Sequence, residues 1–217
     1  HTHTNILLIR GHMPTFSELM NTQTLLPIIQ ADTVEDGVKV ATTMLEAGLN
    51  LVEVVLRTPA SLAMVSAIKA ACPEMIVGAG TITNAEILKD AIDAGADFII
   101  TPTITPTLLA ALADSPVPVV PGVSSMSDIL LAIEHGYTEL KLFPASLSGG
   151  APFLQAVNAV FPQLRFCPTG GISPANKADY LALPNVVAVG GTWVSKKEWV
   201  TAKNWQAIFD ACQEASV

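Results

Sequence analysis

From residue 25 onward, short runs of apolar and often β-branched residues alternate with longer segments whose apolar residues recur every three or four positions. Runs of the first kind are typical of buried strands, and the second spacing is typical of amphipathic helices. We count eight such runs, which begin at Leu25, Leu51, Met75, Phe98, Val117, Glu139, Arg165 and Val186. Because strands that alternate with helices indicate parallel strands with helical crossovers, the pattern predicts eight β/α units.

Eight such units close naturally into a (β/α)₈ TIM barrel, and we predict this compact α/β fold with a single domain. The alternative is an open, doubly wound sheet. A G-x-G-x-x-G fingerprint after the first strand would favour that sheet, but the only partial match, Gly78–Thr81, has two of the glycines and lies in the third unit. We assign residues 13–217 to one catalytic barrel domain and residues 1–12 to an arm that is either disordered or an artificial extension.

Composition excludes several classes of function. The chain has 19 Asp and Glu against 11 Lys and Arg, and its basic residues form no stripe with interleaved aromatics, so nucleic acid is not an expected partner. No apolar run reaches the roughly 18 residues of a membrane span, so no membrane association is expected. Three widely spaced cysteines without a C-x-x-C pair predict neither disulfides nor a zinc site, and they favour a reducing, cytoplasmic location.

One lysine interrupts an otherwise apolar strand, in the segment ELKLFPA of Glu139–Ala145. Lysine is rarely buried without a reason. Because strand side chains alternate between faces, Leu140 and Leu142 should meet the helices, whereas Lys141 and Phe143 should point into the barrel. Barrel active sites lie at the C-terminal ends of the strands, so Lys141 is expected beside the mouth.

The second strand carries two more ionisable residues on its inner face. Glu53 and Arg57 are four residues apart in LVEVVLRT, so both share the face of Leu51 and Val55. One interpretation is a buried ion pair that only fixes packing. The other is catalysis: a neutral lysine amine attacks a carbonyl to form a Schiff base, a carboxylate shuttles protons, and an arginine fork holds a substrate carboxylate.

Other strand ends add polar and flexible positions. Thr81 can offer a hydroxyl after the third strand, and Pro102 is expected to shape the mouth after the fourth. Glycine pairs end the seventh and eighth strands, where barrels often bind phosphate through backbone N–H groups. Two ordinary glycine turns are the alternative. Lys196 and Lys197 follow closely and could assist.

A metal site is not expected. Three of the four histidines, His1, His3 and His12, fall in the arm, and His135 stands alone near a helix end. Catalytic zinc needs several clustered histidine and carboxylate ligands. A lone histidine near the end of a helix is more often a capping or surface residue.

Five segments, LVEVVLRT, IVGAGTI, ELKLFPA, RFCPTGGISPAN and VGGTW, closely resemble the bacterial KDPG/KHG aldolases in sequence, order and spacing. The likeness extends over nearly the whole chain from about Leu25. It implies a class I aldolase on a (β/α)₈ barrel that is metal-independent, needs no cofactor, and is a cytoplasmic homotrimer. Such an enzyme cleaves 2-keto-3-deoxy-6-phosphogluconate, or 4-hydroxy-2-oxoglutarate, into pyruvate and an aldehyde, which is glyceraldehyde 3-phosphate or glyoxylate.

The resemblance also implies a role for each matching residue. Lys141 would form the Schiff base, and Glu53 would be the general acid and base. Arg57 and Thr81 would hold the pyruvate carboxylate, while Thr169 would contact the aldehyde part and influence stereochemistry. The phosphate end would consist of Gly170, Gly171, Gly190, Gly191 and Thr192. We expect Phe143 and Pro102 in the pocket wall.

Two departures from the family pattern bear on the substrate. Gln30–Thr33 reads QADT, with an acid where many members carry a basic residue, and Thr192 stands where some relatives have serine. A weaker phosphate clamp would favour another 2-keto-3-deoxy sugar acid, such as the 6-phosphogalactonate derivative, or an unphosphorylated keto acid. Outside the family, the alternatives are a phosphosugar isomerase or decarboxylase without a covalent lysine, and a non-catalytic binding barrel.

Overall fold

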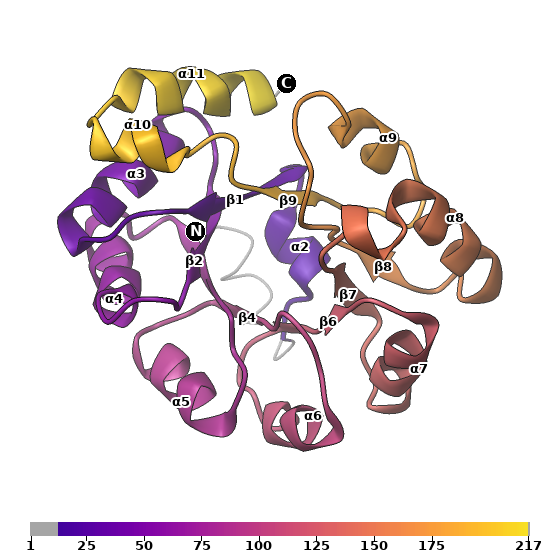
Figure 1. The fold of residues 1–217 in the computed structure, drawn as a ribbon. Coiled ribbons are helices and arrows are strands. Elements are labelled where there is room, and N and C mark those ends of the chain that lie inside the picture. The colour runs from indigo at the N-terminus through magenta and orange to yellow at the C-terminus, as the bar shows by residue number, and fades with distance from the viewer. Residues whose placement is uncertain (1–12, 217) are drawn as a thin grey trace.

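All the strands run parallel around a closed ring in the computed structural model, which describes residues 13–216 (Figure 1). The strands are short, with two to five residues each. The strands are β1 (Leu25–Ile29), β2 (Leu51–Val55), β3 (Ile76–Gly80), β4 (Phe98–Ile100), β5 (Val119–Val120), β6 (Gly122–Val123), β7 (Glu139–Leu142), β8 (Arg165–Phe166) and β9 (Val189–Gly191).

Pairing accounts for the eight positions of the ring. Six strands follow the order β5-β4-β3-β2-β1-β9, and three follow β6-β7-β8. Bridges Phe166↔Val186 and Thr169↔Gly190 join the β8 side to the β9 side. Strands β5 and β6 are two halves of one predicted strand, interrupted at Pro121, which has no N–H to donate to a neighbour. The predicted (β/α)₈ barrel is therefore confirmed, with its fifth strand split.

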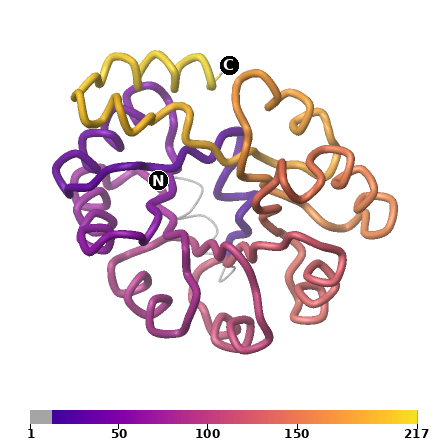
Figure 2. Tube along the Cα trace, viewed as in Figure 1, coloured from indigo at the N-terminus to yellow at the C-terminus, as the bar shows by residue number. Residues whose placement is uncertain are grey.

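Helices surround the ring on its outside (Figures 1 and 2). Several begin at a Thr, Asn or Ser whose side chain accepts a backbone N–H of the first turn, as Thr33 and Asn84 do. His135 ends one helix as its C-cap, as expected. The helices are α3 (Val34–Glu46), α4 (Ser61–Ala71), α5 (Ala85–Asp93), α6 (Pro106–Leu112), α7 (Met126–Glu134), α8 (Gly150–Val160), α9 (Lys177–Leu181), α10 (Lys197–Thr201) and α11 (Trp205–Ala215), with a 3₁₀ turn at Ser146–Ser148.

A short helix that the sequence pattern did not predict, α2 (Phe16–Met20), closes the N-terminal end of the barrel (Figure 1). Thr15 and Glu18 form a reciprocal capping box at its start. The ring of Phe16 meets that of Phe98 with centroids 5.3 Å apart. Ser17 donates its backbone N–H and its hydroxyl to the carboxylate of Glu139, at the start of β7.

Strand parity divides the buried residues into two layers, as expected. Val52, Val54, Leu140 and Leu142 face the helices. The barrel interior below the mouth is filled by α2 and by apolar side chains of the inner faces, among them Leu26, Leu51, Phe98, Ile100, Val120 and Cys167. The arm proposed for residues 1–12 lies outside the described residues. Within residues 13–216, no helix combines the length and apolarity that crossing a bilayer requires.

Candidate active site

A cavity of about 370 Å³ opens at the C-terminal ends of the strands. Its floor is the apolar interior, and its walls come from all around the ring. Apart from the accessory Lys196, the site residues predicted from the sequence line it: Glu53, Arg57, Thr81, Pro102, Lys141, Phe143, Thr169, Gly170, Gly171, Gly190, Gly191 and Thr192. The structure therefore brings together residues separated by up to 139 positions, from Glu53 to Thr192, because each lies on a parallel strand or in the loop that follows one.

Lys141 lies on the inner face of β7 and is only 7% exposed. Its Nζ lies 4.3 Å from the centre of the Phe143 ring, two residues further along the same face. The backbone N–H of Lys141 donates to the carbonyl oxygen of Pro121 on the neighbouring strand, at 2.9 Å. The β7 ladder thus fixes the stem, and the aromatic face holds the amine at the cavity wall.

Glu53 lies on the inner face of β2 and is 2% exposed. Burial raises the pKa of its carboxyl above the ordinary value, and the positive charges of Lys141 and Arg57 oppose that rise only in part. Glu53 takes part in none of the ion pairs found among residues 13–216. The direct Glu53–Lys141 pair that the packing interpretation requires is therefore not formed.

Glycine at position 80 leaves the space that the Glu53 carboxylate occupies. A Cβ built on Gly80 would lie 2.5 Å from Oε2 of Glu53. The next residue, Thr81, has a φ of 63°, in the left-handed region. A β-branched residue there is a genuine outlier, and such strain persists only where the surroundings impose it. The tight end of β3 thus sets both the carboxylate and the Thr81 hydroxyl at the cavity.

Glycines at the ends of β8 and β9 allow the close approach of these two strands. A Cβ on Gly190 would lie 2.3 Å from Oγ1 of Thr169. Gly170 and Gly171 have φ angles of 105° and 73°, which side chains other than glycine rarely adopt. This side of the cavity is consequently walled by backbone, with Thr169 and Thr192 adding hydroxyls.

Comparison with known proteins agrees with this geometry. The family model described as KDPG and KHG aldolase matches residues 16–211. The chain belongs to the KDPG and KHG aldolase family. It is 43% identical over 191 residues to the 2-dehydro-3-deoxy-phosphogluconate aldolase of Pseudomonas aeruginosa, which covers 88% of this chain and 87% of the relative. It is 40% identical over 197 residues to the KHG/KDPG aldolase of Escherichia coli (strain K12), with 91% and 92% covered.

A solved structure from the same family superimposes closely. The KDPG aldolase of Legionella pneumophila, with pyruvate captured at low pH as a covalent carbinolamine intermediate, has a TM-score of 0.90 and 37% identity. The match covers 93% of this chain and 98% of that chain.

Two hydroxyls at this aldolase-family cavity were missed by the sequence reasoning. Ser61 accepts the backbone N–H of Thr58 at 3.2 Å, and their hydroxyl oxygens are 3.0 Å apart. Both side chains line the cavity beside Arg57. The T-P-A-S spacing at the start of α4 was the available signal, but hydroxyls at that place are usually helix caps.

Asp32 and Lys197 also line the cavity, from the loop after β1 and the first residue of α10. Oδ1 of Asp32 lies 3.7 Å from Nζ of Lys197, and both side chains are about two-thirds exposed. Lys196, by contrast, places its amine 4.9 Å from the centre of the Trp199 ring and does not line the cavity. Of the two predicted accessory lysines, the structure brings only Lys197 to the site.

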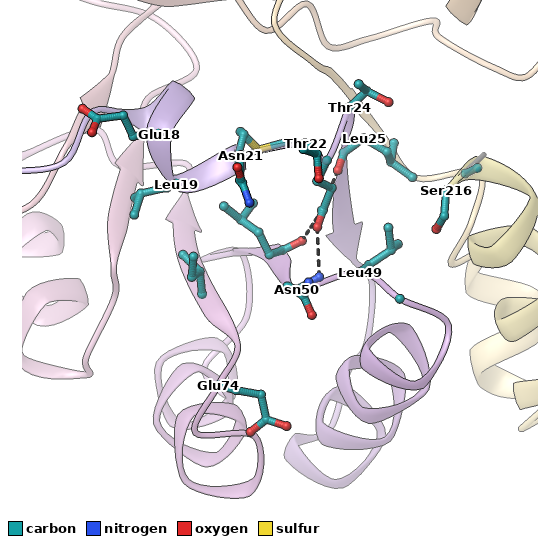
Figure 3. A pocket seen from close by; sticks show the side chains of 16 residues that line it. Glu18, Leu19, Asn21, Thr22, Thr24, Leu25, Leu49, Asn50, Glu74 and Ser216 are labelled. Atoms are coloured by element: carbon teal, nitrogen blue, oxygen red, sulfur yellow. Dashed lines mark hydrogen bonds between the residues drawn. The ribbon is translucent and has the colours of Figure 1, made fainter. Parts of the chain in front are cut away.

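A second cavity, of about 410 Å³, lies at the opposite end of this aldolase-family barrel (Figure 3). Its polar lining serves the fold: the Gln23 amide donates to the carbonyls of Leu25 and Leu51, and its oxygen accepts the N–H of Asn50. The described residues that line it include no lysine, arginine or histidine. The cavity at the mouth, by contrast, is lined by Arg57, Lys141 and Lys197.

Proposed function

We propose that this protein is a class I aldolase that cleaves 2-keto-3-deoxy-6-phosphogluconate into pyruvate and glyceraldehyde 3-phosphate. The carrying observation is the arrangement of Lys141 and Glu53. Strands β7 and β2 stand four positions apart in the eight-position ring, so the amine and the carboxylate enter one cavity from opposite sides. They form no ion pair, and a substrate carbonyl fits between a nucleophile and an acid–base group so arranged.

In the proposed reaction, the neutral amine of Lys141 attacks the C2 carbonyl carbon of the substrate. The carbinolamine gains a proton on its oxygen and loses water, which leaves an iminium. A base then takes the proton of the C4 hydroxyl, the C3–C4 bond breaks, and the aldehyde leaves. The electron pair of that bond moves into the iminium to give an enamine, which is protonated at C3 and hydrolysed to pyruvate and free lysine.

Glu53 is the proposed base for the C4 hydroxyl and the proposed acid for C3. Both tasks need a carboxyl that can gain and lose a proton near the working pH, and the raised pKa of Glu53 moves it in that direction. The positive charges of Lys141 and Arg57 favour the ionised carboxylate of Glu53, so the ionised form can take part as well. The same residue can therefore accept the proton in one step and return one in the next.

The remaining cavity residues divide by their place in the ring. Arg57 and Thr81, after β2 and β3, are the proposed binding groups for the carboxylate next to C2. Thr169 is the proposed contact for the aldehyde part. The backbone of Gly170, Gly171, Gly190 and Gly191, with the Thr192 hydroxyl, is the proposed phosphate end, and Phe143 and Pro102 form the proposed wall. The carbinolamine captured in the Legionella pneumophila relative supports the covalent route.

Reductive trapping tests the proposal. The protein is incubated with pyruvate and sodium borohydride, and the adduct is located by intact mass and peptide mapping. We expect one pyruvate-derived adduct on Lys141, which Lys141→Met removes and Lys196→Gln retains, because Lys196 lies outside the cavity. A folded wild-type protein without an adduct would contradict the Schiff-base mechanism and favour a non-covalent isomerase or decarboxylase. An adduct on Lys197 instead would contradict the assignment of Lys141 as the nucleophile.

Three further parts of the proposal rest on the family resemblance: a cytoplasmic location, a homotrimer and metal-independent catalysis. Within residues 13–216, no three His, Cys, Asp or Glu side chains gather closely enough to hold a metal ion. All three cysteines are free and buried. Light scattering tests the trimer, and turnover after treatment with a chelator tests the metal independence.

A further inference from the structure

The charged side chains of the mouth cavity fall into two groups. Among the described residues, the first group lies on or just after β2 and on β7, and it consists of Glu53, Arg57 and Lys141. The second group lies in the segments after β1 and β9, and it consists of Asp32 and Lys197. Strands β9 and β1 are paired neighbours, and the glycine pairs end β8 and β9. Asp32 and Lys197 therefore flank the backbone-walled side of the cavity, away from Arg57 and Thr81.

The backbone of the Lys197 loop is fixed. The buried hydroxyl of Ser195 donates to the carbonyl of Ile28 on β1 at 2.6 Å, and the N–H of Ser195 donates to the carbonyl of Thr192 at 3.0 Å. Asp32 directly precedes Thr33, the N-cap of α3. Both charges are thus held over the mouth by the backbone, while the side chains themselves remain free to reorient.

The contact between these two side chains is loose. The 3.7 Å separation is an ion pair without a hydrogen bond, and solvent reaches both partners. Exposed pairs of this kind contribute little to stability. An anion that enters this side of the cavity can therefore replace Asp32 as the partner of the Lys197 amine. The negative charge of Asp32 stays nearby and repels that anion.

We propose that Asp32 and Lys197 together determine selectivity for the distal group of the substrate. Lys197 is the side-chain cation that pairs with a distal phosphate, and Asp32 opposes a phosphate dianion while tolerating an uncharged hydroxyl end. The inference rests on the proposed aldolase function and names a residue pair within its phosphate end. The result is an enzyme whose preference for phosphorylated over unphosphorylated 2-keto-3-deoxy sugar acids is weaker than Lys197 alone would make it.

The test compares cleavage of 2-keto-3-deoxy-6-phosphogluconate and 2-keto-3-deoxygluconate, which differ only in the distal phosphate. The readout is the ratio of the two kcat/KM values. We expect Asp32→Asn, and the second variant Asp32→Ser, to raise this ratio about three- to tenfold, and Lys197→Gln to lower it by a similar factor. Both effects should shrink as salt is added, because the groups are exposed.

The chain supplies a matched control pair. Lys203 and Asp36 are 3.0 Å apart and also join the start of α3 to the segment after β9, but neither lines the cavity. Asp36→Asn and Lys203→Gln should leave the ratio within about twofold. If Asp32→Asn and Lys197→Gln only lower the melting temperature and leave the ratio unchanged, or if Asp32→Asn lowers the ratio, the inference is overturned. If the wild type cleaves neither substrate, the proposed function fails and this inference falls with it.

Discussion

Replacing Glu53 by glutamine should stabilise the barrel at neutral pH while it abolishes most of the activity. The two side chains have nearly the same size, so the contact with Gly80 is kept. Glutamine cannot exchange a proton at the reacting carbon, and we expect kcat to fall by about two to four orders of magnitude. The effect on stability has the opposite sign, because burial of the charge outweighs the attraction of Lys141 and Arg57.

The pH window follows from the raised pKa of Glu53. Below the ordinary value of 4.5, the carboxyl is protonated in both the folded and the unfolded chain, and it has no effect on the pH dependence. Above 4.5, the unfolded chain loses the proton while the folded chain keeps it. The free energy of unfolding of the wild type then falls by about 1.4 kcal/mol per pH unit until the folded pKa is passed, and stays lower beyond it. Glutamine does not titrate, so its advantage grows over this window.

Urea unfolding of both proteins at a series of pH values between about 4 and 8 measures the difference directly. We expect the difference in unfolding free energy between Glu53→Gln and the wild type to rise with pH from 4.5 upward. A difference that falls with pH, or a variant that unfolds at neutral pH, would refute it. That outcome would show that the ionised carboxylate stabilises the barrel as an ion-pair partner, and the packing interpretation of Glu53 and Lys141 would stand.

Substitutions at two further positions separate other contributions. Thr81→Ala and Thr81→Gly should both weaken pyruvate binding about tenfold or more, because both lose the hydroxyl. The glycine variant should be about 1 kcal/mol more stable than the alanine variant, because glycine accepts the positive φ. Unchanged pyruvate binding in both variants would remove Thr81 from the carboxylate site. Glu139→Gln weakens the acceptor for the N–H and hydroxyl of Ser17, so the free energy of unfolding in urea should fall by about 1–2 kcal/mol. The value of kcat should stay within twofold of the wild type. A large fall in kcat would mean that α2 positions Lys141.

Periodicity was enough to predict the barrel and the direction of its key side chains. A two-residue alternation placed Lys141 and Glu53 on inner faces, and the common edge of parallel strand ends accounts for Arg57, which lies in the loop after β2 and not on the strand face that was predicted. The same logic gave Thr81 and the glycine pairs. These positions follow from local geometry and from the order of the strands, both of which a single sequence contains.

Features that depend on packing between distant segments were missed. The split at Pro121 reflects a missing donor toward the neighbouring strand, and a run of apolar residues does not reveal it. Helix α2 has only five residues, too few for periodicity, although its capping box was present in the sequence. The approach of Asp32 to Lys197 depends on the bond from Ser195 to Ile28, across 167 residues, and no pattern within one element encodes it.

Helix α2 also limits the route by which substrate and products enter and leave the proposed active site. Phe16, Phe98 and their neighbours fill the barrel below Lys141, so within residues 13–216 the catalytic cavity is closed at its floor and open at the C-terminal ends of the strands. Both products must leave through the opening by which the substrate came. The aldehyde departs first, because pyruvate stays bonded to Lys141 until water reaches the imine. Because the floor is filled, the departing aldehyde and the water that releases pyruvate must use the same opening one after the other.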